Sequence, residues 1–435
     1  MTSRKPSKKN FKKFFTLLKE VENIKEFSLK SNGLRVVYLH IPDTGVITSN
    51  IVYHVGSRDE MPGETGLAHM LEHMLFKPTT FDIARKQSGA AMVFEREIGV
   101  LLNATTSKDR TNYYFSYPKE HLSRALRIEA ERMNSVVLTD KEFLPERTNV
   151  LSEFDMYNGM PEFALEKNML GAAFMSHPYG HEVIGSREDI ESYTTKKLGR
   201  FYETHYMPNN ATLIVVGDVT EDTLFEEVYT SFSSLQSKVL LPKAIINEPT
   251  QEGIRHISIE RPSTTNIVAI GIKHPGFPSR EWNETVALLK ILADGPDSIL
   301  HRALVDTGKA AQVHSLFDTG CETSVAMILI TLSAPKKHQT ILDEALTLIN
   351  SVRKEVLAAE LKKTIAQIVD TEPFSRDSSF KIAAELTEYV AAKNWPAYFE
   401  TEKSLREITP AVLVKRRDTL FNRTQITTGF FIGTK

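Results

Sequence analysis

Residues 66–76 constrain the fold and chemistry of this chain more than any other stretch, because they contain His69-x-x-Glu72-His73. On a helix, residues four apart lie one turn above each other, so the two imidazoles project from the same side. At roughly 100° per residue, Glu72 falls on that side as well. Leucines and methionines occupy the opposite side. The pattern therefore predicts a helix that packs on a core and presents its histidines to a cleft.

Two imidazoles with a carboxylate between them suit a catalytic zinc ion, which takes three protein ligands and leaves one position for water. Glu72 would then act as general base on that water. The order is the inverse of His-Glu-x-x-His and is a known metallopeptidase motif. The competing interpretation is a helix with two core histidines and an unrelated glutamate.

A third zinc ligand is expected on the predicted helix 140–157. Glu146 and Glu153 are seven residues apart on it, just under two turns, and so share one face. One of them can bind the metal while the other supports the site from behind. The spacing alone leaves open which residue has which role.

Length and composition limit the class of protein. A chain of 435 residues exceeds what one hydrophobic core supports. A formal net charge of −2 gives no argument for nucleic acid as a partner. The longest apolar runs have strand length, so no membrane span is expected. Cys321 is the single cysteine, which excludes a disulfide framework and is typical of a reducing compartment. We expect a cytoplasmic protein, with the mitochondrial matrix and the periplasm as alternatives.

The N-terminus is basic, and no apolar core of signal-peptide length follows it. We therefore expect no secretory signal. Residues 1–28 are predicted to form a basic tail and an amphipathic helix near residues 10–26. A mitochondrial transit peptide is the alternative interpretation.

The rest of the chain divides into two parts with the same order of elements. Residues 29–234 form the zinc-binding half, 235–250 a linker, and 251–435 a second half without the motif. The first half is predicted to contain a hairpin (27–39), strands (46–55, 103–106, 111–117 and 212–216) and long helices (121–134, 140–157 and 162–174). Thr65 is expected to cap the histidine helix, Thr139 to cap the helix 140–157, and Pro145 to interrupt the latter after its first turn.

The second half repeats this order, from a hairpin-like pair of strands at 254–272 to a last strand at 427–432. We therefore predict a duplicated α+β fold, in which each half is a mostly antiparallel sheet covered by helices. One metal site per chain follows, because only the first half has the motif.

Six stretches carry a resemblance to a known family. They read HVGSRDE (54–60), TGLAHMLEHMLFKPT (65–79), NATTSKDRTNYYF (103–115), ERTNVLSE (146–153), HPYGHEVIGS (177–186) and YMPNNATLIVVGDV (206–219). With them the chain resembles the short-chain branch of the M16 metallopeptidases, the pitrilysin, insulysin and mitochondrial-processing-peptidase group. The resemblance implies the duplicated fold of that group. It also implies that His69, His73 and Glu153 are the zinc ligands, Glu72 the base, and Glu146 the supporting carboxylate.

The same resemblance makes Asn103, Ala104 and Thr105 part of an edge strand that pairs with an extended peptide substrate. It implies that Asn103 contacts the substrate backbone near the scissile bond. An aromatic residue is commoner in the family where Thr105 stands, which implies a less apolar pocket here. Without the resemblance, an ordinary strand end would be the preferred interpretation.

The second half departs from the family pattern. Active single-chain relatives supply an arginine and a tyrosine there, which bind substrate and stabilise the oxyanion. Here Val305 and Ala311 occupy those positions, and Arg302 is interpreted as a surface residue. The resemblance thus implies the zinc-bearing subunit of a two-subunit clamshell that hydrolyses short, unstructured peptides, with a homologous subunit supplying the missing pair. A homodimer is the alternative assembly. The alternative function is a metal-binding but catalytically idle scaffold subunit.

Overall fold

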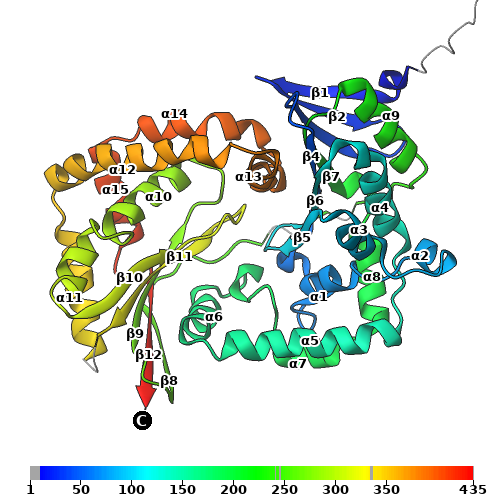
Figure 1. Cartoon of the computed structure of the whole chain (residues 1–435). Coiled ribbons are helices and arrows are strands. Elements are labelled where there is room, and N and C mark those ends of the chain that lie inside the picture. Colours follow the sequence, from blue (N-terminus) through cyan, green and yellow to red (C-terminus); the bar gives the residue numbers. More distant parts are fainter. Residues whose placement is uncertain (1–9, 241, 244–245, 334–336, 435) are drawn as a thin grey trace, which may run out of the picture.

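Two β-sheets organise the molecule, one in each half (Figure 1). The computed structural model describes residues 10–240, 242–243, 246–333 and 337–434. The strands of the first sheet are β1 (Phe15–Val21), β2 (Ile24–Leu29), β3 (Arg35–His40), β4 (Val46–Tyr53), β5 (Leu101–Thr106), β6 (Thr111–Pro118) and β7 (Ala211–Gly217). Those of the second are β8 (Arg255–Pro262), β9 (Ile267–His274), β10 (Ala310–Leu316), β11 (Ser324–Leu332) and β12 (Ile426–Thr434).

The two sheets have the same topology. The first has the order β1-β2-β3-β7-β4-β6-β5 and the second β10-β11-β9-β12-β8, so the last five strands of the first match the second, read backwards. In each sheet one pair is parallel, β3 with β7 and β8 with β12, and the other pairs are antiparallel. The predicted duplicated α+β fold is confirmed. The expected hairpin of the second half is wrong in one respect, because β12 lies between β8 and β9.

Helices cover the sheets on both faces (Figure 1). Those of the first half are α1 (Leu67–Met74), α2 (Thr80–Ala84), α3 (Ala90–Ile98), α4 (Leu122–Ser135), α5 (Asp140–Asn158), α6 (Pro161–Ala173), α7 (Arg187–Ser192), α8 (Thr195–His205) and α9 (Glu221–Phe232). Those of the second are α10 (Arg280–Leu292), α11 (His338–Ser351), α12 (Lys354–Ser375), α13 (Ser379–Ala391), α14 (Thr401–Arg406) and α15 (Pro410–Leu420), with a π-helical turn at His301–Val305. None of the described helices is long and apolar enough to cross a membrane.

The predicted N-terminal helix is wrong. Phe11–Phe14 form a short 3-10 turn, and the chain then enters the hairpin of β1 and β2. The apolar spacing fitted a helix, but tertiary contacts favour strands: Phe15 stacks on Phe225 of α9 with ring centroids 4.5 Å apart, and Phe27 meets the same ring edge to face at 4.9 Å. The first sheet thus begins inside the predicted segment 1–28, whose residues 1–9 lie outside the described part. The linker boundaries stay a prediction.

Helix α5 is continuous across Pro145, so the predicted interruption is wrong. The Thr139 side chain makes no capping hydrogen bond either, because the Glu142 amide that it would accept from donates to the Thr139 carbonyl oxygen instead. A single straight element therefore carries both Glu146 and Glu153.

The two halves exchange helices. One face of the second sheet is covered by α6 of the first half, where Met169 is fully buried against β9, β11 and β12. One face of the first sheet is covered by α13 of the second half, where Leu386 is fully buried against β4 and β7. Gly429 on β12 permits the close approach, since a Cβ there would lie 2.6 Å from Sδ of Met169.

Candidate metal centre

Helix α1 enters the site through a tight junction. Gly66 has a φ of +90°, and a Cβ on it would lie 2.2 Å from the carbonyl oxygen of Ile184. The buried Glu60 carboxylate accepts from the backbone N–H groups of Gly66 and Ala68, both at 2.7 Å. These bonds satisfy the free amides of the first turn. The predicted cap is therefore wrong: Thr65 instead donates its hydroxyl to Asp189 at 2.5 Å.

His69, His73 and Glu153, the three ligands that the resemblance implies, lie close together. Oε2 of Glu153 lies 3.8 Å from Nε2 of His69 and 3.5 Å from Nε2 of His73. The two imidazole rings meet edge to face with centroids 4.7 Å apart. Ligands about 2.0–2.1 Å from a tetrahedral zinc ion lie roughly 3.3 Å from each other, so the three side chains need move little to hold one. Among the described residues, this is the one group of three such side chains that could hold a metal ion.

Glu146 supports the pair from behind. Nδ1 of His73 donates to Oε1 of Glu146 at 3.0 Å, and Lys77 pairs with Oε2. The hydrogen bond to His73 and the Lys77 ammonium lower the pKa of Glu146 to about 2. With Nδ1 bonded to Glu146, Nε2 is the ring nitrogen that faces Glu153, and in the neutral ring its lone pair would be available to a metal ion.

The electrostatics of the site favour a cation. Burial lowers the pKa of His73, but its hydrogen bonds to Glu146 and Glu153 outweigh burial and raise it to about 9. Burial and the neighbouring His73 lower the pKa of His69 to about 4. The negative charges of Glu146 and Glu153 thus favour the protonated, cationic form of His73. A bound metal ion would balance the same two negative charges. The donor set fits zinc.

Glu72 lies on the same side of α1 as the two histidines and is held in place by strand β5. Thr106 of β5 donates its hydroxyl to Oε2 of Glu72 at 2.5 Å. Glu72 is buried, which raises the pKa of its carboxyl. A carboxyl group with one oxygen bonded and a raised pKa is suited to accept and return a proton.

Strand β5 is the last strand of the first sheet, and its outer edge has no partner strand among the described residues. The amide of Ser107 donates to the carbonyl of Arg110, so the backbone groups of Ser107 point towards β6. In an antiparallel pair, the backbone groups of successive residues point alternately towards the partner strand and away from it. Those of Thr106, Ala104 and Leu102 therefore point away from β6, to the open edge. The Ala104 amide is covered by Oδ1 of Asn103 at 2.9 Å. The edge therefore offers main-chain donors and acceptors to an extended peptide.

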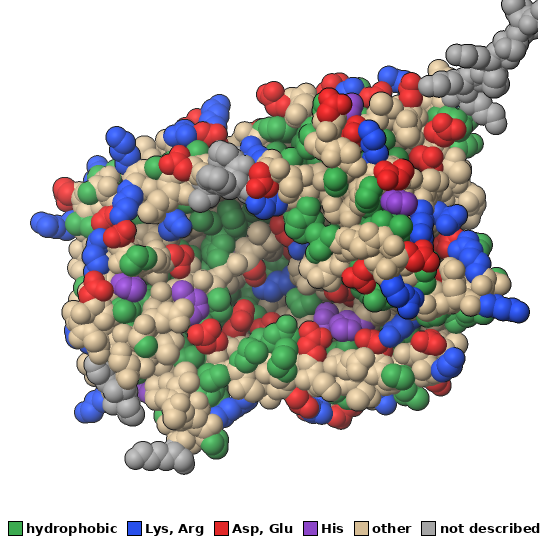
Figure 2. Space-filling view, in the orientation of Figure 1, with side chains coloured by type: hydrophobic (Ala, Val, Ile, Leu, Met, Phe, Trp, Pro, Cys, Tyr) green, Lys and Arg blue, Asp and Glu red, His purple; other side chains and the backbone are tan. Residues whose placement is uncertain are grey.

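These groups share one cavity of about 770 Å³. It is lined by the predicted residues His69, Glu72, His73, Asn103, Ala104, Thr105, Glu146 and Glu153, together with Phe76, Lys77, Met92, Thr106, Tyr157, Phe163, Glu182, Val183 and Ile184. On the face shown in Figure 2 the molecule is hollowed between its two halves, and histidine side chains gather at the edge of the hollow. All predicted site residues thus lie at one place.

The tip of the β5–β6 hairpin is held by the second half. Nζ of Lys108 donates to Oδ2 of Asp318 at 2.5 Å, and the Asp109 carboxylate accepts from the Cys321 amide at 2.9 Å. Nε of Arg110 donates to Glu388 of α13 at 3.0 Å. Lys108, Asp109 and Arg110, which follow the end of β5, are therefore all held by contacts with the second half.

The second half has no counterpart of this centre among its described residues. Val305 ends the π-helical turn and packs on the core of that half, while Ala311 is exposed on β10. Arg302 pairs with Glu360 of α12 at 3.0 Å, in agreement with its interpretation as a surface residue. Neither expected position holds an arginine or a tyrosine.

Sequence reasoning missed Thr106, Lys77 and Glu60. The first two had a usable signal: Thr106 shares a strand face with Ala104, and Lys77 lies one helical turn after His73. Glu60 had none, because it precedes α1 in a loop whose course the local pattern does not fix.

Comparisons with known proteins identify relatives of this chain. A family model described as insulinase (peptidase family M16) matches residues 35–187, and one described as the peptidase M16 inactive domain matches residues 192–368. The chain is 31% identical to the zinc protease PqqE of Helicobacter pylori over 407 residues, which cover 92% of this chain and 90% of that one.

Solved structures resemble the whole chain. The crystal structure of a protease from Helicobacter pylori superimposes with a TM-score of 0.88 at 30% identity, and the match covers 95% of this chain and 100% of that one. A peptidase M16 inactive domain from Pseudomonas fluorescens has a TM-score of 0.83 at 16% identity, over 95% and 98% of the two chains, which shows the shared fold.

Proposed function

The chain belongs to the M16 (insulinase) peptidase family, and on that premise we propose that it is a zinc-dependent endopeptidase of short, unstructured peptides. One observation carries the proposal. Two imidazole Nε2 atoms and a Glu153 oxygen converge within 4.8 Å of one another, in the same cavity as Glu72 and an unpaired strand edge. That combination suits metal-assisted hydrolysis of an extended peptide.

Each residue has a distinct role in this proposal. His69, His73 and Glu153 would hold one zinc ion, and Glu146 would orient His73 through Nδ1. When bound, zinc supplies Lewis acidity and lowers the pKa of a water molecule. The free oxygen of Glu72 takes a proton from the attacking water and returns it to the leaving amine. Thr106 keeps the other oxygen in place.

The substrate would bind as an additional strand on β5. The outward backbone groups of Ala104 and Thr106 provide the hydrogen bonds, after the Asn103 side chain has moved off the Ala104 amide. A cavity of about 770 Å³ holds a few residues and no folded domain, which supports unstructured peptides as substrates.

A partner subunit forms the second part of the proposal. Val305 and Ala311 offer no group that can stabilise an oxyanion, so a homologous chain would supply an arginine and a tyrosine across a clamshell. A homodimer of low activity is the alternative assembly, and an idle scaffold subunit is the alternative function. The cytoplasmic location stays a prediction.

Peptidase assays on a mixed pool of unstructured peptides, with this chain alone and with the protein encoded beside it, test the proposal. Cleavage only in the mixture supports the two-subunit enzyme. Full cleavage by the chain alone refutes the need for a partner, and no cleavage in either case favours the scaffold role. Glu72→Gln is the internal control: it should retain zinc and lose turnover, and a variant that still turns over would refute the proposed base.

A further inference from the structure

The two faces of the sheet at β5 are covered by different helices. Direct cross-strand neighbours share a face, and Ala104 is opposite Tyr113, which packs in the core beneath α1. Thr105 is opposite Asn112, on the other face of the sheet. This second face is the one covered by α13 of the second half, where Asn50 donates to Thr387 at 2.6 Å. Alternate side chains of a peptide paired with β5 would therefore point to α1 and to α13.

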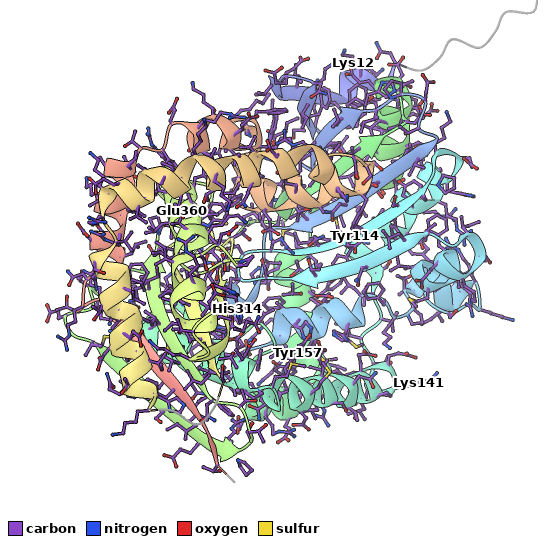
Figure 3. The ribbon with its side chains drawn as sticks, turned by 60° about the vertical axis from the view of Figure 1, so that its left-hand side comes forward. Lys12, Tyr114, Lys141, Tyr157, His314 and Glu360 are labelled. Carbon is purple, nitrogen blue, oxygen red and sulfur yellow. The ribbon has the colours of Figure 1, made fainter. Side chains whose placement is uncertain are left out.

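A second cavity, of about 270 Å³, lies between this face and α13. Tyr114 of β6, labelled in Figure 3, packs against Phe380 of α13 with ring centroids 5.1 Å apart, and both rings line this cavity. Ala383 and Ala384 of α13 complete the apolar part of its surface. Thr105 lines both this cavity and the one at the metal centre, so the two meet at the edge strand.

The polar side chains around this cavity are already paired with each other. Arg110 is bonded to Glu388 and also donates to Oδ1 of Asn112 at 2.6 Å. Asn112 donates in turn to Oδ1 of Asn50 at 2.9 Å, and Asn50 to Thr387. A polar ligand would have to break one of these bonds, whereas an apolar group contacts rings and methyl groups at no such cost.

We propose that this cavity is a specificity pocket for a large apolar side chain of the substrate, the one beside Thr105 on the face turned to α13. Its apolar surface comes from Tyr114, Phe380 and the two alanines of α13, and Thr105 contributes a polar edge. The inference rests on the proposed peptidase function and deepens it. An added strand would lie about 4.8 Å from β5, where Thr105 lines the cavity, and about 9.6 Å from β6. A leucine, methionine or aromatic side chain is long enough to enter the cavity at Thr105, whereas an alanine or serine side chain is not. The second half of the chain would thus select the substrate that the first half cleaves.

Ala384 provides a test that leaves the edge strand and the metal centre unchanged. It is exposed on α13 and lines the cavity, so Ala384→Phe fills the pocket without disturbing a core. Ala359→Phe on α12, also exposed and outside the cavity lining, is the matched control. Cleavage sites in a random peptide library are then profiled by mass spectrometry for the wild type and both variants, with whatever partner the activity requires.

The wild type and Ala359→Phe should share a preference for large apolar residues at one position near the scissile bond. In Ala384→Phe, the kcat/KM ratio of leucine to serine at that position should fall about tenfold or more, with the serine peptide cleaved as before. An unchanged profile in Ala384→Phe overturns the pocket while the peptidase function stands. Absence of any cleavage refutes the proposed function instead.

A second measurement needs no turnover. Crystals of the wild type and of Ala384→Phe are soaked with p-cresol, the side-chain analogue of tyrosine. Density for the ring inside the cavity, against Tyr114 and Phe380, in the wild type alone supports the pocket. An empty cavity in the wild type, or equal binding by both proteins, overturns it.

Discussion

Replacing Glu146 by glutamine should weaken zinc binding about tenfold. In the structure Nδ1 of His73 donates to Oε1 of Glu146 at 3.0 Å, which directs Nε2 of the same ring towards Glu153. Glutamine keeps an acceptor oxygen at nearly the same place but removes the negative charge. The hydrogen bond therefore becomes neutral, and Lys77 loses its ion-pair partner.

The magnitude follows from the class of the bond. Hydrogen bonds to a charged group contribute about 1.5–3 kcal/mol, and neutral ones about 0.5–1.5 kcal/mol. The midpoints of these ranges differ by roughly 1.3 kcal/mol, which corresponds to a factor of close to ten in affinity. Loss of the acceptor altogether, in Glu146→Ala, should approach the hundredfold end of the range of about 10–100 seen for groups that orient metal ligands.

The pH of the measurement decides whether this effect is visible. Glu146 also raises the pKa of His73, to about 9 together with Glu153, so at neutral pH its removal makes the ligand easier to deprotonate and offsets part of the loss. Zinc affinity should therefore be measured by competition with a chelator at a pH above 9, where His73 is neutral in both proteins. The expected tenfold difference should shrink as the pH is lowered to 7.

The matched control is Asp155→Asn, which removes a carboxylate from the same helix at a position where its side chain is 61% exposed and bonded to Arg187. It should leave zinc affinity unchanged. Wild-type affinity in Glu146→Gln above pH 9 would contradict the orienting role. An equal loss in Asp155→Asn would show that net charge, rather than the bond to His73, is responsible.

Three further variants test the fold. Gly66→Ala should destabilise the protein by about 2 kcal/mol or more and lower its Tm, because the φ of +90° and the adjacent backbone oxygen exclude a Cβ; an unchanged Tm would contradict this. Glu248 is desolvated, but Lys273 and three backbone amides outweigh burial and lower its pKa to about 2. The stability advantage of the wild type over Glu248→Gln should therefore be complete above about pH 4.5 and vanish as the pH falls towards 2, as measured by urea unfolding; a constant difference would refute the assignment. Met169→Ala, beneath Gly429, should cost about 2–5 kcal/mol in a single calorimetric transition of both halves, and two separate transitions would contradict the helix exchange.

The metal centre could be predicted because its parts are local. The i, i+4 spacing of His69 and His73 and the seven-residue spacing of Glu146 and Glu153 each follow from the pitch of one helix. The resemblance then brought the two helices together, which helical spacing alone cannot do. The strand predicted at 103–106 is also present, as part of β5, with Ala104 and Thr106 on the face of α1.

The errors occurred where distant contacts outweigh local preference. Residues 10–26 have apolar spacing that suits a helix, yet Phe225 of α9 fixes Phe15 in a strand. The charged turn Lys108–Arg110 gives no local sign that it is anchored on the second half. Its partners Asp318 and Glu388 are more than two hundred residues away in the sequence.

The duplication explains why a metal-free half is present at all. Strand β7 is buried along its whole length, which its apolar sequence predicted, and a strand buried on both faces needs a layer on each side. The first half supplies one layer, through α1, α4 and α9. The second layer is α13, where Leu386 packs against the sheet while Glu388 holds the hairpin tip and Ala384 lines the proposed pocket. Isolated residues 29–234 would expose that sheet face and release the edge strand that carries Thr106. The described residues of the second half therefore serve, without a metal-ligand group of their own, as the layer that completes the first half.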